Sequence, residues 1–137
     1  MYCDEWELTR LAIYLTIDLY MKKYKLIEHC KKTFKLSNGY KYKVKFNYEQ
    51  YIYFNYHSWI LGSDVGLNKD NCDGYIIVYP KNSIGMYRDD FIWILIKTDD
   101  IIDMIKDKMY ICDEKTIMKS RYKFSLQDFI NRGKLLL

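Results

Sequence analysis

The chain has 137 residues, of which 50% are hydrophobic and 18% aromatic, and its net charge is +4. This size and hydrophobic content suit one compact domain, residues 1–137, and exclude an intrinsically disordered chain. The longest apolar run, residues 91–96, is too short to cross a bilayer, so we expect no membrane partner. The acidic first residues lack the pattern of a secretion signal, so we expect a cytoplasmic protein.

Residues 4–23 are predicted to form a long helix, because apolar side chains recur every three or four positions. Asp4 is the expected N-cap, and two glutamates follow it in the first turn. Further aromatic and branched side chains widen the apolar stripe. We therefore expect this helix to be buried on most sides.

The next segments are predicted to be strands, at residues 24–30, 33–36, 40–46 and 51–56, with a turn at 37–39. Residues 62–74 are rich in Gly, Asp and Asn and are predicted to be a loop, with Asp70 and Asp73 as turn residues. The nearly continuous apolar runs 75–80 and 91–97 predict two central strands that are buried on both faces.

The C-terminal third is predicted to hold two short helices. Thr98 is the expected cap of a helix over 98–108, a short strand follows at 109–113, and Ser125 caps a last helix that ends at Gly133. The order of elements predicts an α/β domain with a central mixed β-sheet, flanked by an N-terminal helix and by C-terminal helices.

The positive charge is concentrated in residues 21–47, which hold nine lysines and one acid, Glu28, for a net charge of +8. One interpretation is a face that binds a polyanion such as nucleic acid. The other is a lysine-rich edge that prevents a sheet from pairing with its neighbours. Under the first interpretation, the phosphate contacts would be Lys31, Lys32, Lys35, Lys41, Lys43 and Lys45.

Motifs for nucleotide binding, zinc binding or a nucleophilic serine do not occur in the sequence. The four cysteines, at 3, 30, 72 and 112, form no CxxC pair, and we expect reduced thiols unless the source is a hyperthermophile or its virus. Asp73 opens one apolar strand and Lys97 closes the other, so the two could belong to one site. We predict no metal site, because aspartates in Gly-rich loops usually serve turns.

A long helix with an early glutamate, then a hairpin, further strands and a helix resembles the PD-(D/E)xK nucleases. This superfamily includes restriction endonucleases and archaeal Holliday-junction resolvases. The resemblance implies a restriction-endonuclease-like fold, in which a helix glutamate, an aspartate and an E-x-K triad hold Mg²⁺ and activate water. Glu5 or Glu7 matches the helix glutamate, and Lys45 matches the lysine.

The acids of that motif are replaced in this chain. Lys43 stands where E-x-K has its acid, and Lys32 or Thr33 stands where the aspartate is expected. Because lysines would repel Mg²⁺, the resemblance implies a nuclease-like fold that binds nucleic acid without hydrolysis and without a cofactor.

Catalysis would need other acids. The catalytic candidates are then Glu7, Asp73 and Lys45. If the acids have moved to Asp73, Asp64 or Glu28, the chain is instead an active Mg²⁺-dependent DNA endonuclease.

A protein-interaction module is the alternative from a different class, because tyrosine and tryptophan are frequent interface anchors and the chain has fifteen tyrosines. Such a module would inhibit or assemble with a protein partner. Its candidate surface is Trp59, Asp64 and Asn68, in and beside the predicted loop. The length and pattern are also compatible with a homodimer.

Overall fold

The computed structural model describes residues 4–58, 66–81, 90–115 and 119–136. Within these ranges the elements are, in chain order, α1 (Glu5–Leu19), β1 (Leu26–Cys30), β2 (Thr33–Leu36), β3 (Lys41–Phe46), β4 (Ile52–Ser58), α2 (Leu67–Asp70), β5 (Gly74–Pro80), β6 (Phe91–Lys97), α3 (Thr98–Lys106), β7 (Cys112–Lys115), β8 (Lys119–Phe124), α4 (Leu126–Arg132) and β9 (Lys134–Leu135).

The strands form two sheets. The main sheet has the order β1-β2-β3-β5-β6-β9, and the smaller sheet has the order β4-β8-β7. In the main sheet β3 and β5 are parallel, and the other neighbours are antiparallel. The predicted α/β class with a mixed central sheet is therefore confirmed.

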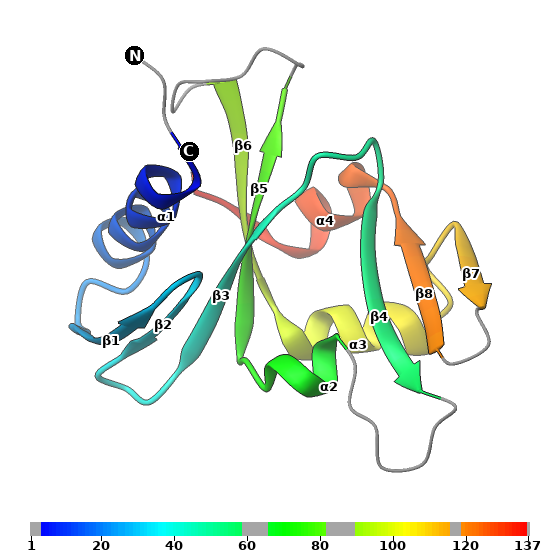
Figure 1. Cartoon of the computed structure of the whole chain (residues 1–137), viewed down its shortest axis with the longest axis horizontal. Helices are drawn as coiled ribbons and strands as arrows, with labels where there is room; N and C mark the ends of the chain where they lie inside the picture. The colour runs from blue at the N-terminus through cyan, green and yellow to red at the C-terminus, as the bar shows by residue number, and fades with distance from the viewer. Residues whose placement is uncertain (1–3, 59–65, 82–89, 116–118, 137) are drawn as a thin grey trace.

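The two faces of the main sheet are covered differently (Figure 1). Helix α1 lies on one side, which we call the first face. The smaller sheet lies on the other side together with α3 and α4, and we call this side the second face. Because neighbouring side chains of a strand point to opposite faces, each strand of the main sheet divides its residues between two separate clusters of buried side chains.

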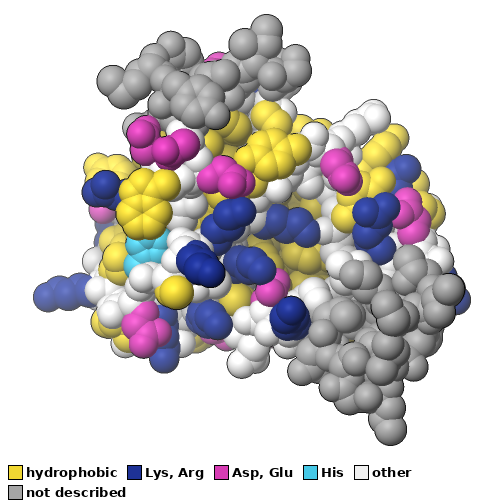
Figure 2. Space-filling view, viewed as in Figure 1, with side chains coloured by type: hydrophobic (Ala, Val, Ile, Leu, Met, Phe, Trp, Pro, Cys, Tyr) yellow, Lys and Arg dark blue, Asp and Glu magenta, His cyan; other side chains and the backbone are white. Residues whose placement is uncertain are grey.

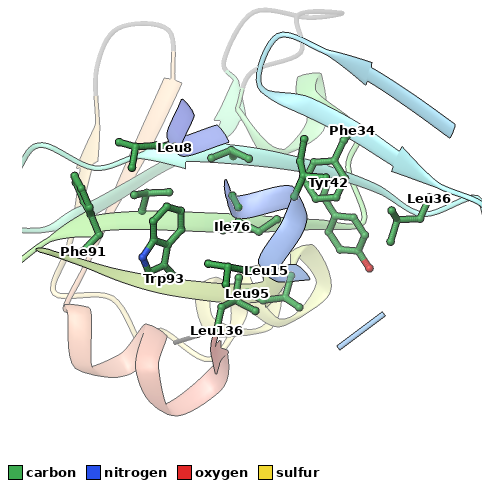
Figure 3. Close-up of a cluster of buried hydrophobic side chains, with 14 residues drawn as sticks. Leu8, Leu15, Phe34, Leu36, Tyr42, Ile76, Phe91, Trp93, Leu95 and Leu136 are labelled. Carbon is green, nitrogen blue, oxygen red and sulfur yellow. The ribbon is translucent and has the colours of Figure 1, made fainter. Parts of the chain in front are cut away.

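The core of the first face lies between α1 and the sheet (Figure 3). Trp93 is fully buried there, and Phe34 of β2 stacks on Tyr42 of β3 with 5.4 Å between ring centroids. Leu8 and Leu15 of α1 close this cluster from above the sheet. The predicted alternation of aromatic and lysine residues in β3 is what sends Tyr42 into this core.

The core of the second face lies between the main sheet and the smaller one. Phe54 of β4 contacts Tyr75 of β5 edge-on and stacks on Phe129 of α4. Ile77 and Ile94 are fully buried in the same cluster. Strands β5 and β6 therefore supply buried side chains to both faces, which confirms the prediction of two central strands.

Two of the three predicted caps are confirmed. The Asp4 carboxylate accepts the Glu7 amide at 2.9 Å, and the Ser125 hydroxyl accepts the Asp128 amide at 3.2 Å. The prediction for Thr98 is wrong, because Lys97 occupies the N-cap position and Thr98 is the first helical residue. The Thr98 hydroxyl instead donates to the carbonyl of Cys72 at 2.7 Å, which ties α3 to the start of β5.

The prediction that the first helix is buried on most sides is wrong. Helix α1 ends at Leu19, and one of its faces stays open to solvent, with Trp6 57% exposed. A second layer over α1 would be needed to bury the wide apolar stripe, and no described element supplies one. Trp6 finds a partner in His29 of β1, whose ring stacks on it at 5.5 Å.

Several elements were not predicted. Helix α2 lies inside the predicted loop, β8 and β9 were not expected, and β7 begins at Cys112 rather than at 109. These segments are short. Strands β8 and β9 pair with β4 and β6, which are distant in sequence, and β7 and β8 lack a strong apolar pattern. No helix in the described part of the chain is long and apolar enough to span a membrane.

Candidate functional site

A row of lysines lies on the second face of the main sheet, on β2 and β3. Tyr42 and Val44 point into the first-face core, so Lys41, Lys43 and Lys45 project on the opposite side. Lys35 of β2 lies directly opposite Lys41 in the antiparallel register. We call this surface the lysine face, and it consists of Lys35, Lys41, Lys43 and Lys45.

The smaller sheet covers only part of the second face. Its strand β4 packs over β5 and β6 through Ile52 and Phe54 and also covers the Lys45 end of β3, whereas no described element covers β2 and the Lys41 end of β3. The lysine face therefore lies beside a raised part of the surface that is formed by β4. We call β4 the wall strand, and we call the change in height between the two a step. Figure 2 shows Lys and Arg side chains gathered over β3, between the α1 side and the smaller sheet.

Asp70, at the end of α2, holds the ammonium of Lys43 in the middle of the lysine row. Its Oδ1 lies 2.8 Å from the Lys43 ammonium, and its Oδ2 accepts the Tyr75 hydroxyl at 2.8 Å. Burial and the hydrogen bond to Asp70 both raise the pKa of Tyr75, so this hydroxyl keeps its proton at neutral pH. The sequence indicated only a turn residue here, because the partners of Asp70 come from two other strands.

Lys45 is held beneath the wall strand. Its ammonium donates to the carbonyl of Tyr53 and lies 3.8 Å from the centre of the Phe54 ring. Burial is the main cause that lowers the pKa of Lys45 to about 8. The ammonium of Lys45 therefore has protein partners, and it joins β3 to β4.

We expect the Lys45→Met variant to remove a pH dependence of stability. Between pH 8 and 10.5 the unfolded chain holds a proton on Lys45 that the folded chain has released, so the stability of the native protein rises over this range. For a partly exposed side chain the gain is about 2 kcal/mol. Urea unfolding at pH 7.5, 8.5 and 9.5 measures it as the difference between the native protein and Lys45→Met. Parallel pH profiles for the two proteins would contradict the assignment.

Of the six lysines predicted as phosphate contacts, three form neither an ion pair nor a side-chain hydrogen bond in the described residues. They are Lys35 and Lys41 on the lysine face and Lys31 in the tight turn between β1 and β2. Lys32 differs, because its ammonium lies 3.4 Å from Glu5 of α1 and 5.2 Å from the centre of the Phe46 ring. Lys31, Lys35 and Lys41 are therefore the lysines most available to an anion.

The outer side of the smaller sheet continues the positive surface. Arg121 of β8 stacks on Tyr53 and Lys123 stacks on Tyr51, each 4.0 Å from the ring centre. Glu114 of β7 forms an ion pair with Arg121, which lowers the pKa of Glu114. These cation–π pairs stand at the top of the step, above the lysine face.

The three catalytic candidates lie on different parts of the fold. Glu7 is exposed on α1, which covers the first face, whereas Lys45 lies on the second face. The Asp73 carboxylate accepts the Lys41 amide at 2.8 Å, at the end of the sheet where β5 begins. Within the described ranges, no three His, Cys, Asp or Glu side chains are grouped as metal ligands.

The predicted interaction residues are only partly described. Trp59 and Asp64 lie outside the described residues. Asn68 of α2 is exposed, and its amide donates to the carbonyl of Tyr56 at 3.2 Å. This bond ties α2 to β4, so Asn68 belongs to the wall of the step.

In the described residues, Cys30, Cys72 and Cys112 form no hydrogen bond with the ring of His29, whose Nε2 contacts the carbonyl of Lys31. Cys30 is an exposed free thiol, and Cys72 is a buried one whose pKa is raised by burial. The Cys72 thiol donates to the carbonyl of Asp70 at 3.3 Å. Both observations favour a structural role for Cys72.

No family model matches the chain, and comparisons with curated proteins and with solved structures find no match either. The fold and the site together define a mixed α/β protein whose main sheet carries an open, lysine-rich face. Its function has to be argued from the chemistry of that face.

Proposed function

We propose that the protein binds nucleic acid through the lysine face and does not hydrolyse it. The observation that carries this proposal is the open half of the second face, where Lys35 and Lys41 stand side by side without acidic partners in the described chain. An unpaired ammonium on a sheet surface is a ready contact for phosphate oxygens. A lysine row that only protected a sheet edge would lie on an edge strand, whereas β3 is an interior strand of the main sheet.

The geometry suits a phosphate backbone. Alternate lysines of one strand are about 7 Å apart, and Lys35 extends the row sideways onto β2. The wall strand limits the approach from one side, and the Arg121 and Lys123 pairs add positive charge above it. Contacts of this kind are independent of base sequence, so the proposed complex is sensitive to salt and insensitive to sequence.

The absence of hydrolysis is proposed from the charge of the site. Mg²⁺ needs carboxylate oxygens, and Asp70, which contacts the row, is already shared by Lys43 and Tyr75. The order of helix α1, strand β1, hairpin β2–β3, further strands and helix α3 is compatible with the resemblance to PD-(D/E)xK nucleases. A restriction-endonuclease-like fold without its acids is part of the same proposal.

The test is a binding titration with duplex, single-stranded and branched DNA at low and moderate salt, with Mg²⁺ or Mn²⁺ added and the products run on a gel. The Lys35→Gln/Lys41→Gln double variant is expected to bind at least about tenfold more weakly at low salt. Its dependence on salt should fall by the equivalent of about two phosphate contacts. The matched control is Lys106→Gln/Lys108→Gln, which changes two exposed lysines at the end of α3.

The outcomes of this titration distinguish binding without hydrolysis, an active nuclease, and a lysine face that is not the nucleic-acid site. Salt-sensitive binding without cleavage, weakened only by the double variant on the lysine face, supports the proposal. Cleavage would overturn the non-hydrolytic part, and Asp73→Asn would be the next variant. No binding at low salt, or equal weakening by the control, would overturn the lysine face as the site.

A protein-interaction module is the second candidate, and one observation favours it. Trp6 on α1 and the side chains of Leu26 and Ile27 on the edge strand β1 are large, apolar and exposed. Exposed apolar side chains gathered near a sheet edge are typical of an interface. Light scattering at rising concentration tests the homodimer, and Ile27→Lys should abolish any dimer that uses β1.

A further inference from the structure

A pocket of about 300 Å³ lies at the end of the main sheet where β3 and β5 begin and β6 ends, and Tyr42 and Leu95 of the first-face core line it. The end of α1, the start of α3, strand β9 and the ends of β3, β5 and β6 surround it. Leu95 and Met21 give it an apolar part, and the rings of Tyr20 and Tyr40 line its sides. Its size is that of a site for one small molecule.

The floor of the pocket contains a polar group without a partner. Tyr42 is 3% exposed, yet its hydroxyl makes no hydrogen bond with any described residue and lines the pocket. In Figure 3 the oxygen of Tyr42 points away from the apolar side chains of the first-face core. Gly74 keeps the ring in this position, because a Cβ atom at residue 74 would lie 3.0 Å from it. A hydroxyl that opens on a cavity can contact water or a ligand there.

Charged side chains of both signs surround the pocket. Three cations and three acids line it: Lys97, Arg132, Lys134, Asp73, Asp99 and Asp100. Within the described chain none of the six pairs with another, but the Arg132 guanidinium lies 3.8 Å from Asp107, which is not part of the lining. Lys97 and Lys134 are therefore the cations available to a ligand. Lys97 ends β6 directly opposite Gly74, so it stands on the same floor as Tyr42. The Lys134 ammonium lies 5.5 Å from the centre of the Tyr20 ring. Asp73 and Lys97, which the sequence places at the ends of two strands, therefore meet in this pocket.

A ligand with one sign of charge is a poor fit for such a site. A phosphate or another dianion would be attracted by Lys97 and Lys134 and repelled by the three acids, and a cation would be attracted by the acids and repelled by the two lysines. A zwitterion can place each of its charges beside groups of the opposite sign. The tyrosine rings and Leu95 then suit an apolar or aromatic body.

We propose that this pocket binds a small zwitterion of the amino-acid class with an aromatic or long apolar side chain. Its carboxylate lies toward Lys97 and Lys134, its ammonium toward Asp99 and Asp100, and the Tyr42 hydroxyl contacts its polar end. Burial, with a smaller contribution from Asp73, raises the pKa of Tyr42 to about 12, so this hydroxyl remains a donor at neutral pH. The site is separate from the lysine face and does not depend on nucleic-acid binding.

The experiment compares three probes that differ in charge only. They are L-phenylalanine, 3-phenylpropionate, which lacks the ammonium, and phenethylamine, which lacks the carboxylate. Titration of the full chain, followed by NMR, is expected to give a dissociation constant on the order of 1 mM or below for phenylalanine. Each singly charged analogue is expected to bind at least about tenfold more weakly.

Two variants are expected to change, in opposite directions, which of the two singly charged analogues binds more tightly. Lys97→Met should weaken phenylalanine about tenfold and make phenethylamine the better of the two analogues. Asp100→Asn should favour 3-phenylpropionate instead. Lys35→Met, on the opposite face of the sheet, is the control and should change none of the three affinities.

Three results would overturn the proposal. One is the absence of phenylalanine binding at a concentration of about 10 mM, well above the expected constant. The second is equal binding of all three probes, which would show that the charges take no part. The third is an equal loss of affinity in Lys97→Met and Lys35→Met. Nucleic-acid binding by the native chain is measured separately, so it can persist whichever result is found.

Discussion

Phe54→Ala is expected to lower the free energy of unfolding by about 4 kcal/mol, which would be the largest effect of any substitution considered for this chain. Phe54 is 4% exposed and its ring joins three elements. It lies 5.1 Å from the Tyr75 ring on β5, 5.9 Å from the Phe129 ring on α4 and 3.8 Å from the Lys45 ammonium on β3. Removing it leaves a cavity between the two sheets and takes away the aromatic partner of a buried charge.

The control for this prediction is Phe54→Leu, which keeps most of the buried volume. It should cost only about 1 to 1.5 kcal/mol, because the aromatic contacts are lost but the cavity is small. Urea unfolding of the native chain and both variants measures the two values. A loss below about 1.5 kcal/mol for Phe54→Ala would mean that the smaller sheet contributes little to the stability of the main one.

The same substitution links stability to the candidate site. Phe54 holds β4 over the second face, and β4 is the wall beside the lysine face. When the ring is removed, the Lys45 ammonium gains water, and the burial that lowers its pKa is relieved. In Phe54→Ala the rise in stability between pH 8 and 10.5 should therefore shrink along with the stability itself.

The sequence predicted those parts of the fold that depend on neighbouring residues. Asp4 and Ser125 cap helices through atoms three residues away, and both predictions are confirmed. The continuous apolar runs of β5 and β6 can only be stable with both faces covered, so their central place in the sheet was also predictable. Thr98 failed as a cap because its hydroxyl bonds to the distant Cys72 carbonyl.

The second sheet could not be predicted in the same way. Strand β4 pairs with β8, so Ile52 lies opposite Phe124, seventy-two positions later in the chain. The charged pattern of β8 carries no strong apolar signal that would indicate this pairing. Pairings of such separation depend on the whole fold rather than on local preference.

The candidate site was likewise predictable where it depends on neighbouring residues and not where it depends on distant segments. The alternation in β3 predicted that its lysines share one face, which agrees with the burial of Tyr42 and Val44 on the other. The different surroundings of those lysines were not predictable. Lys45 lies beneath β4, Lys43 meets Asp70, and Lys41 has no acidic partner in the described residues, because β4 and α2 cross only one end of the row. Burial by distant segments thus decides which lysines are available.

Asp70→Ala is expected to cost about 3 kcal/mol of stability. The substitution leaves two groups without partners, the Lys43 ammonium and the Tyr75 hydroxyl, which is almost fully buried. Asp70→Asn is the matched control. It keeps an oxygen that can accept from Tyr75 and loses only the ion pair with Lys43, so about 1 to 2 kcal/mol is expected. Urea unfolding at neutral pH separates the two values.

The same two variants should bind nucleic acid more tightly, although they are less stable. Each one removes a negative charge from the lysine face and releases the Lys43 ammonium for a phosphate contact. The expected gain at low salt is about threefold to tenfold, with a steeper dependence on salt, in the titration used for the lysine variants. Under conditions where urea unfolding shows both variants to be folded, a gain that accompanies a loss of stability comes from the change of charge on the lysine face. Weaker binding by Asp70→Asn would instead make Asp70 an acid that the ligand or its metal ion needs, which is the prediction of an active nuclease.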